Sequence, residues 1–426
     1  MNLNNPSLVL QSLFSIFARF AGVGLNFVVA MLITHNLPTN EAGMIFMLMV
    51  MVTGISLFSR LGIEQWIVRD VAGLPEADLQ AQQAVHLRSA YKLLGLSSLV
   101  FIVFWLLSSQ IIKAALFDDQ AKLYLIWIAA LGILLFNLVM VHSAFMKATH
   151  HISESLLIQN ALPAISMLIA MLIFWPIFKD AQNYLWIYIF SLAIAAFISF
   201  FWIKPWWNKL KKPTLTVQTA REVLEKSLPL APVSFFAFMM LWADTVMTGL
   251  MLKNEDVALY NVAARVSFVS GFFLGALDAT IYPRLLKAHK QDPQQLKKIF
   301  WQGSLIVAVV LSLVSIILSL IAKPLLGLGF GEVYRQASWV LVILLVSQLI
   351  RGLGLTCSFM FIIEEKVKLL NTLLFIALIT NIIANLFLIP VYGIEGAAAA
   401  TLLSNLTLTG GVILLFTHQH LLSHYH

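Results

Sequence analysis

Five charged residues lie inside long apolar segments of this chain: Arg19, Asp244, Arg265, Asp278 and Arg351. An ionised group in hydrocarbon costs at least about 2.5–3.5 kcal/mol on insertion scales, so such residues usually face a wet cavity or a partner. Arginine presents a planar fork of donors that binds phosphate oxygens bidentately and stays charged. A carboxylate can bind a proton or a metal cation. The set therefore predicts a site for an anionic group and a separate site for a coupling cation.

Two of the arginines belong to polar stripes with helical spacing. The first stripe repeats at steps of 3, 4, 3 and 4 and comprises Ser12, Ser15, Arg19, Gly22 and Asn26. The second repeats at steps of 4, 3 and 4 and comprises Ser347, Arg351, Gly354 and Ser358. Such spacing places each set on one face of a helix. Either the two faces line a cavity for a diphosphate, or their small residues pack helices closely while the arginine bonds a neighbouring carbonyl.

Asp244 and Arg265 fall at similar depths in consecutive apolar segments, which leaves two interpretations open. A structural salt bridge would reduce the cost of both charges. Alternatively, Arg265 and Asn261, one turn apart, bind an anionic substrate, while Asp244 binds a coupling proton or sodium ion. Asp278 lies near the end of its segment, where it either reaches the membrane interface or serves as a second ion-coupling candidate.

Twelve apolar segments must position these residues. A helix needs about 20 mainly apolar residues to cross a hydrocarbon core of roughly 30 Å. The hydrophobic content of 60% and charged content of 11% contrast with about 25% charged residues in soluble proteins. The sequence predicts an all-α polytopic membrane protein with spans near 8–33, 42–59, 90–111, 122–146, 155–178, 184–203, 228–252, 258–283, 300–322, 335–363, 367–389 and 394–417.

Lysine and arginine concentrate in the connectors that follow even-numbered segments, for example Arg60, Lys204, Lys211 and Arg221. Because positive connectors are retained in the cytoplasm, both termini are predicted to be cytoplasmic. The net charge of +7 then reflects membrane topology and attraction to anionic headgroups, and it does not indicate a nucleic-acid partner. The first segment lacks the features of a cleaved signal peptide, and the single cysteine, Cys357, is expected to fill apolar space.

The longest basic connector divides the segments into two sets of six. This predicts an N-terminal lobe at 1–210, a cytoplasmic linker with a short amphipathic helix at 211–227 and a C-terminal lobe at 228–426, related by a pseudo-two-fold axis along the membrane normal. Helix starts are expected at Thr219 by capping-box spacing, and after Pro75 and Asp292. No phosphate-binding loop, zinc-protease motif or nucleophile elbow occurs in the sequence. We therefore expect a transporter without a catalytic set, metal centre or organic cofactor.

Residues 386–404, LFLIPVYGIEGAAAATLLS, resemble a segment of the polysaccharide transporter family, the Wzx-like O-antigen flippases of the multidrug/oligosaccharidyl-lipid/polysaccharide superfamily. Residues 35–43, 259–265 and 330–337 resemble other parts of the same family. The resemblance implies two six-helix lobes forming a V and alternating access that moves an undecaprenyl-diphosphate-linked oligosaccharide to the outer leaflet. The repeat unit would serve O-antigen, lipopolysaccharide or capsule synthesis in the bacterial inner membrane, with membrane lipids and glycan polymerase or ligase machinery as partners.

Two alternatives stay open. Asp244 and the shared plan of spans are also compatible with a cation-coupled drug antiporter of the sister multidrug family, although an arginine in the first span disfavours a cationic cargo. A membrane enzyme such as a glycan polymerase is disfavoured because the outer connectors are short and lack clustered acidic or basic residues.

Overall fold

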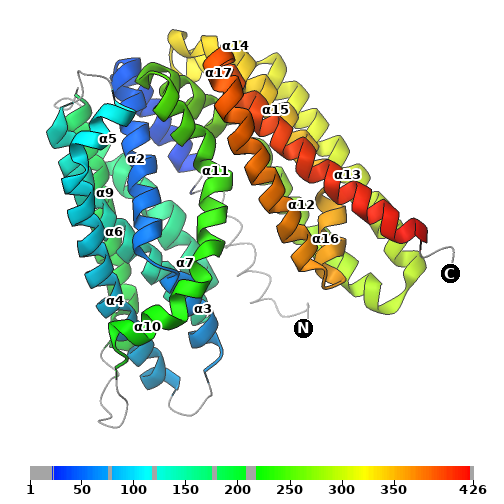
Figure 1. Cartoon of the computed structure of the whole chain (residues 1–426), viewed down its shortest axis with the longest axis horizontal. Coiled ribbons are helices and arrows are strands. Elements are labelled where there is room, and N and C mark those ends of the chain that lie inside the picture. Colours follow the sequence, from blue (N-terminus) through cyan, green and yellow to red (C-terminus); the bar gives the residue numbers. More distant parts are fainter. Residues whose placement is uncertain are drawn as a thin grey trace. The chain divides into compact units, whose positions relative to one another are not determined.

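The computed structural model describes residues 22, 24–74, 79–117, 122–174, 180–207 and 217–422, and within these residues it contains helices and no strand. The chain divides into two compact units, Met1–Met239 and Met240–His426, so the boundary falls inside helix α11. Figure 1 labels most of the helices along the chain. The lobes and linker predicted from the basic connector remain a prediction, and the units are described separately below.

The first unit begins with an apolar helix, Gly24–Asn36. The elements that follow are α2 Thr39–Ser59, α3 Ile63–Ala72, α4 Leu79–Leu107, α5 Ser109–Leu116, α6 Leu123–Ala148, α7 Ile152–Leu156, the π-helical turn η1 Leu157–Ala161, α8 Leu162–Phe174, α9 Ala181–Trp207, α10 Ala220–Ser227, the 3₁₀ turn η2 Leu228–Leu230 and the start of α11 Ala231–Met251. Helix α6 is central, since it contacts α2, α3, α4 and α9.

The second unit contains the end of α11, then α12 Asn254–Gln291, α13 Pro293–Leu320, α14 Ala322–Phe330, the 3₁₀ segment η3 Glu332–Ala337, α15 Ser338–Leu353, α16 Leu355–Ile363 and α17 Val367–Leu422. Gly393, at φ 58° and ψ −134°, interrupts α17 and separates it into two helices. Helix α15 is central here and contacts α12, α13 and α17. Helix α6 thus forms the centre of the described part of the first unit, and α15 forms the centre of the second.

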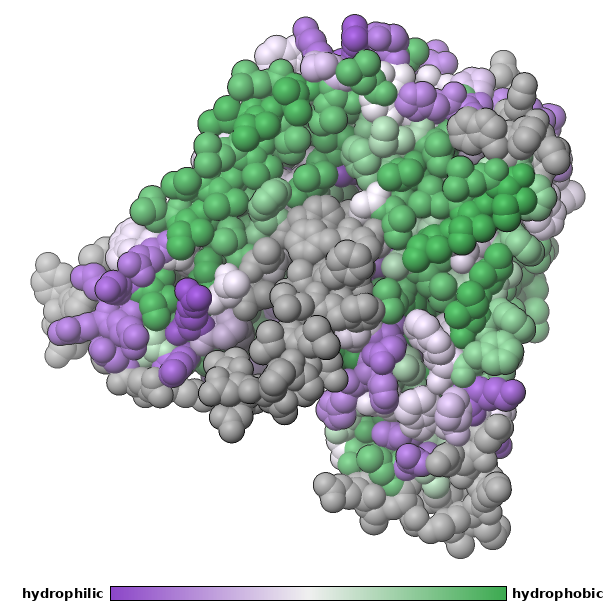
Figure 2. Space-filling model, turned by 180° about the vertical axis from the view of Figure 1, so that it is seen from behind, coloured by the Kyte–Doolittle hydropathy of each residue, from purple (hydrophilic) through white to green (hydrophobic). Residues whose placement is uncertain are grey.

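Ten helices of the described residues are long and apolar enough to cross a membrane. This count treats α17 as one helix, and it leaves out the shorter apolar helix Gly24–Asn36, because the residues before Gly22 lie outside those described. The all-α polytopic membrane fold is therefore confirmed, whereas the number twelve stays a prediction. Figure 2 shows hydrophobic side chains over the flanks of each unit and hydrophilic ones towards its ends.

The predicted helix starts that fall on described residues are confirmed. The Thr219 hydroxyl accepts from the Glu222 amide, and the Glu222 carboxylate accepts from the Thr219 amide, which is a capping box. The Asp292 carboxylate accepts from the amides of Gln294 and Gln295 at 2.8 and 3.3 Å. Pro75 lies outside the described residues. The polar segment after it is not a separate helix, because the described α4 runs unbroken from Leu79 into the apolar span.

Small residues that follow Gly393 in α17 are buried against neighbouring helices. Ala397 and Ala400 are both 0% exposed, and the Ser404 hydroxyl donates to the Ala377 carbonyl at 2.8 Å. A Cβ at Gly396 would lie 2.2 Å from the Leu388 carbonyl oxygen, so only glycine allows this approach of the two parts of α17. This packing fixes the second part of α17 beside the first, which places a hydroxyl of one part near two amides of the other.

Candidate functional site

The Asp244 carboxylate is held by three side chains of α17. Its Oδ1 accepts from the Nδ2 atoms of Asn381 and Asn385 at 2.9 and 2.7 Å, and its Oδ2 accepts from the Thr401 hydroxyl at 2.6 Å. The two asparagines lie one turn apart before the break at Gly393, and Thr401 lies after it. An aspartate on α11 is therefore surrounded by neutral polar groups from both parts of α17.

One acceptor in this cluster lacks a partner among the described residues. Asn385 is 0% exposed, and its Oδ1 makes no hydrogen bond. An unpaired buried acceptor usually costs about 1–3 kcal/mol, which is an argument for an additional group at this position. Tyr260 adds a hydroxyl 3.4 Å from that of Thr401. The cluster thus gathers oxygen atoms from a carboxylate, amides and hydroxyls in one place.

The described side chains include two guanidinium groups in the same part of the unit. Arg265 on α12 donates from Nε to the Asn261 Oδ1 at 2.6 Å, one turn earlier on the same helix. Among the ion pairs formed by described residues, none joins Arg265 to Asp244. Arg351, in the last turn of α15, is exposed. The acid is therefore bound to neutral donors, and the two arginines line the same cavity as the acid.

The sequence left open whether the stripe around Arg351 lines a cavity or packs helices closely, and its residues differ in this respect. Ser347 is 1% exposed and accepts from the Asn405 Nδ2 at 2.7 Å, while the Ser358 hydroxyl donates to the Gly354 carbonyl of its own helix at 2.9 Å. These small residues belong to helix packing. Arg351 itself lines a cavity.

That cavity lies within the second unit and has a volume of about 60 Å³. Its lining includes Asp244, Asn261, Arg265, Arg351, Asn381 and Thr401. Since one water needs roughly 10–15 Å³ measured in this way, the cavity has room for an ion with a few waters. It has no room for a sugar chain.

Of the seven residues predicted from the sequence, the structure brings four around this cavity: Asp244, Asn261, Arg265 and Arg351. Asn26 is not among them; its Nδ2 donates to the Gly22 carbonyl at 2.8 Å and to the Asn160 carbonyl at 3.4 Å, within the first unit. Arg19 lies outside the described residues. Asp278 lies in α12, but its side chain lies outside the described residues as well.

Three residues of the cluster were missed by the sequence reasoning, which selected charged residues: Asn381, Asn385 and Thr401. A signal was present, because Asn381 and Asn385 stand four residues apart within an apolar segment and so share a helical face. The hydroxyl of Thr248, one turn beyond Asp244, donates to the Asp244 backbone carbonyl at 2.7 Å and does not reach the carboxylate.

Comparison with known proteins gives a family match and several relatives. Residues 9–289 match the family model described as polysaccharide biosynthesis protein. The chain is 27% identical over 225 residues to a probable low-salt glycan biosynthesis flippase, Agl15, of Haloferax volcanii, covering 51% of this chain and 46% of that protein. It is 22% identical over 258 residues to the capsular polysaccharide biosynthesis protein CapF of Staphylococcus aureus, covering 59% of this chain and 65% of that protein. The chain thus spans less than two thirds of either relative.

Among solved structures, the inward closed conformation of the lipid II flippase MurJ matches with a TM-score of 0.75 and 13% identity, covering 95% of this chain and 87% of that one. An inward-facing multidrug transporter of the MATE family and MOP superfamily matches with a TM-score of 0.67 and 14% identity, covering 95% and 98%. At these identities the likeness establishes the fold alone, and it is the transporter fold that the resemblance implied.

Proposed function

The chain belongs to the polysaccharide biosynthesis protein family, and from this premise we propose that it is a flippase for a lipid-linked oligosaccharide. The cargo we propose is an undecaprenyl-diphosphate-linked repeat unit for O-antigen, capsule or a related glycan, moved from the cytoplasmic to the outer leaflet by alternating access. The names of the relatives Agl15 and CapF support a role in glycan export. The observation on which the proposal depends most is the cavity that Asp244, Arg265 and Arg351 share.

The arginines are proposed to bind the diphosphate of the cargo. A guanidinium matches phosphate oxygens with two parallel donors, and this pairing is about twice as strong as a neutral hydrogen bond. Arg351 is exposed and both arginines line the cavity, so an anionic headgroup that reaches the cavity can contact both of them. The cavity of about 60 Å³ is too small for the glycan. The sugar chain would therefore lie outside it while the diphosphate contacts its arginines.

The Asp244 cluster is proposed to bind the cation that drives transport. Hard cations prefer oxygen ligands from carboxylates, amides and hydroxyls, and the cluster can supply each kind. Turning the amide of Asn381 or Asn385 by 180° exchanges its nitrogen for its oxygen and presents that oxygen to an ion. One carboxylate balances one monovalent charge. This donor set favours Na⁺ over a proton, which would need the carboxylate alone.

Location and partners follow from the same proposal. We place the protein in a bacterial inner membrane with both termini cytoplasmic, in accordance with the distribution of lysine and arginine. Membrane lipids and the polymerase or ligase that uses the exported repeat unit would be its partners.

A second candidate is a cation-coupled drug antiporter. The likeness to multidrug transporters, with a TM-score of 0.67 for one of them, and the acid at Asp244 favour it. The two candidates differ in what the arginines do. A drug antiporter would tolerate Arg265→Ala, whereas a flippase for a diphosphate cargo would not.

Reconstitution in vesicles tests the proposal. The purified protein is incorporated with a fluorescent undecaprenyl-diphosphate-linked oligosaccharide, and the glycan that reaches the far leaflet is measured with a membrane-impermeant quencher under a Na⁺ gradient, a proton gradient or none. We expect movement that a Na⁺ gradient accelerates. Absence of lipid movement under all three conditions, together with export of cationic drugs by the same vesicles, would establish the second candidate in its place.

A further inference from the structure

The corner between α2 and α3 in the first unit has an unusual backbone. Helix α2 ends at Ser59, and α3 begins at Ile63. Between them, Leu61 has φ 48° and Gly62 has φ 80°, so two consecutive residues occupy the left-handed region. Leucine rarely adopts this conformation, and it persists only where surrounding contacts enforce it.

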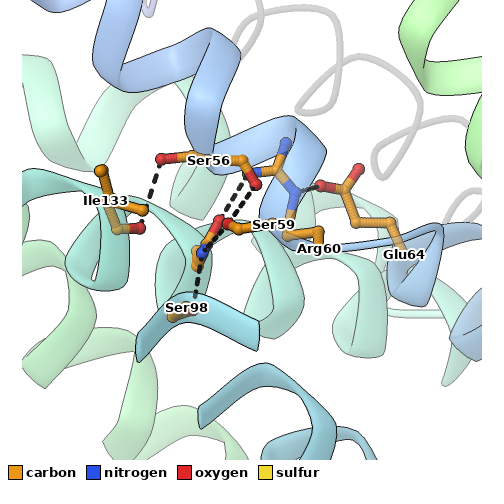
Figure 3. A network of polar contacts seen from close by, with 7 residues as sticks. Ser56, Ser59, Arg60, Glu64, Ser98 and Ile133 are labelled. Atoms are coloured by element: carbon orange, nitrogen blue, oxygen red, sulfur yellow. Dashed lines mark hydrogen bonds and ion pairs between the residues drawn. The ribbon is translucent and has the colours of Figure 1, made fainter. Parts of the chain in front are cut away.

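A buried polar network surrounds this corner (Figure 3). Arg60 is 3% exposed; it forms an ion pair with Glu64, and its Nη1 donates to the Asn137 Oδ1 at 3.0 Å. The Nδ2 of Asn137 donates to the hydroxyls of Ser59 at 2.7 Å and Ser98 at 2.9 Å. Since Ser98 lies on α4 and Asn137 on α6, the network joins the corner to both helices.

The sequence placed Arg60 among the charges of a cytoplasmic connector. The structure places it between α2 and α3 but buries it, and burial lowers the pKa of the guanidinium while Glu64 opposes this change. A buried charge that loses its partner is strongly destabilising. Arg60 therefore favours the arrangement of the corner in which it is paired with Glu64.

Helix α10 and the turn η2 pack against the same corner. A Cβ at Gly62 would lie 2.2 Å from the Ser227 carbonyl oxygen and 2.8 Å from the Ala231 amide nitrogen. Ser227 and Val223 are both 0% exposed. Helix α10 contacts both α3 and α4. Helix α10 and the turn η2 are therefore packed onto the α2–α3 corner, and Gly62 is a point of close approach to Ser227 and Ala231.

We propose that Arg60 is a positioning residue: through Glu64 and Asn137 it holds the α2–α3 corner in the conformation on which α10 and η2 are seated. Helix α10 and the turn η2, which lead into α11, are then a fixed part of the first unit. The consequence for transport rests on the flippase function proposed above. If α10 and η2 were displaced, the N-terminal end of α11, the helix that carries Asp244, would move with them. The seating itself can be measured without any transport.

Cysteine protection tests the seating. In a chain with Cys357→Ala, Ser227→Cys introduces one thiol at a fully buried position whose hydroxyl has no partner among the described residues, so the thiol fits. We expect Arg60→Met to accelerate maleimide labelling of this thiol at least tenfold, and Arg60→Lys to restore much of the protection. Gly62→Ala should also accelerate labelling, because its Cβ would overlap the Ser227 carbonyl oxygen and displace η2 from the corner directly.

Two matched controls separate displacement from unfolding. A thiol from Glu225→Cys, at a side chain 63% exposed, should label at the same rate in every background. A thiol from Ser270→Cys, 0% exposed in the second unit, should stay protected. If Arg60→Met does not fold, Glu64→Gln provides the same test.

Unchanged protection of the Ser227→Cys thiol in Arg60→Met and in Gly62→Ala would overturn the proposal. So would equal loss of protection at Ser270→Cys, since the effect would then be general unfolding. The labelling result and the vesicle assay are independent. Exposure of the thiol in a protein whose parent moves no lipid would support the seating and contradict the flippase.

Discussion

Replacing Asp244 by asparagine should abolish cation binding while leaving the fold intact. The amide has nearly the shape of the carboxylate, so its oxygen can still accept from Asn381 and Asn385, and its NH₂ can donate to Thr401. What is lost is the negative charge. A pair of unit charges about 4 Å apart contributes roughly 4 kcal/mol at an effective dielectric constant of 20. Because each 1.4 kcal/mol is a factor of ten, we expect about a thousandfold weaker Na⁺ binding.

Thermal unfolding in detergent measures this loss. A ligand that binds only the folded state adds about 2.7 kcal/mol to the free energy of unfolding at 100 times its dissociation constant. The Tm of the parent protein should therefore rise when NaCl replaces choline chloride at constant ionic strength. Asp244→Asn should show no such rise at the same Na⁺ concentration, and its Tm in choline should lie close to that of the parent.

Glu332→Gln is a suitable control, since this acid is exposed and pairs with Arg335 far along the chain from Asp244. It removes one negative charge and should keep the full response to Na⁺. The reasoning is refuted if Asp244→Asn retains a Na⁺-dependent rise in Tm equal to that of the parent. It is also refuted if Asp244→Asn and Glu332→Gln lose the response equally, because the effect would then be one of net charge.

Three further outcomes are expected. Arg265→Ala and Arg351→Ala should each reduce lipid movement in vesicles at least about tenfold, because each removes charge-assisted hydrogen bonds worth about 1.5–3 kcal/mol; both should keep the Na⁺-dependent Tm shift, because neither arginine supplies an oxygen ligand, and loss of that shift would contradict this division of roles. Asn385→Ala should weaken Na⁺ binding roughly tenfold in equilibrium binding of radioactive sodium, since it deletes an oxygen ligand; unchanged affinity would remove Asn385 from the site. Gly396→Ala should lower the free energy of unfolding by about 1–3 kcal/mol in a denaturation series, because its Cβ would overlap the Leu388 carbonyl; an unchanged midpoint would show that α17 can shift.

Much of the fold was predictable because the bilayer imposes one strong requirement. Every backbone polar group in hydrocarbon must be satisfied within the chain, so long apolar segments must be helices. The segments 122–146 and 184–203, for example, became α6 and α9. Their ends were harder to predict, because polar residues can extend a helix beyond the membrane. Helix α12 continues to Gln291, past its expected end near 283, since nothing in that stretch except Pro283 disfavours a helix.

The charged members of the site were predictable for a related reason. A charge inside an apolar segment is costly enough to be noticed, and that cost singled out Asp244, Arg265 and Arg351. Their neutral partners were not predicted, because an asparagine or threonine is common in membrane helices for packing alone. Asn381 and Thr401 differ from other such residues only in facing an acid on another helix. Sequence spacing within one helix does not show which face meets which neighbour.

Arg60 and Asp244 show why a charge must be interpreted together with its surroundings. Arg60 was counted as a connector residue, yet it is 3% exposed and paired with Glu64, so its charge is already balanced within the first unit. Asp244 accepts from three neutral donors and forms none of the ion pairs among the described residues, so its charge is stabilised by hydrogen bonds beside the cavity that it lines. A balanced buried charge can be fully explained by structure. The cavity of about 60 Å³ beside Asp244 has room for an ion with a few waters, and this difference is the physical reason to propose positioning for Arg60 and ion coupling for Asp244.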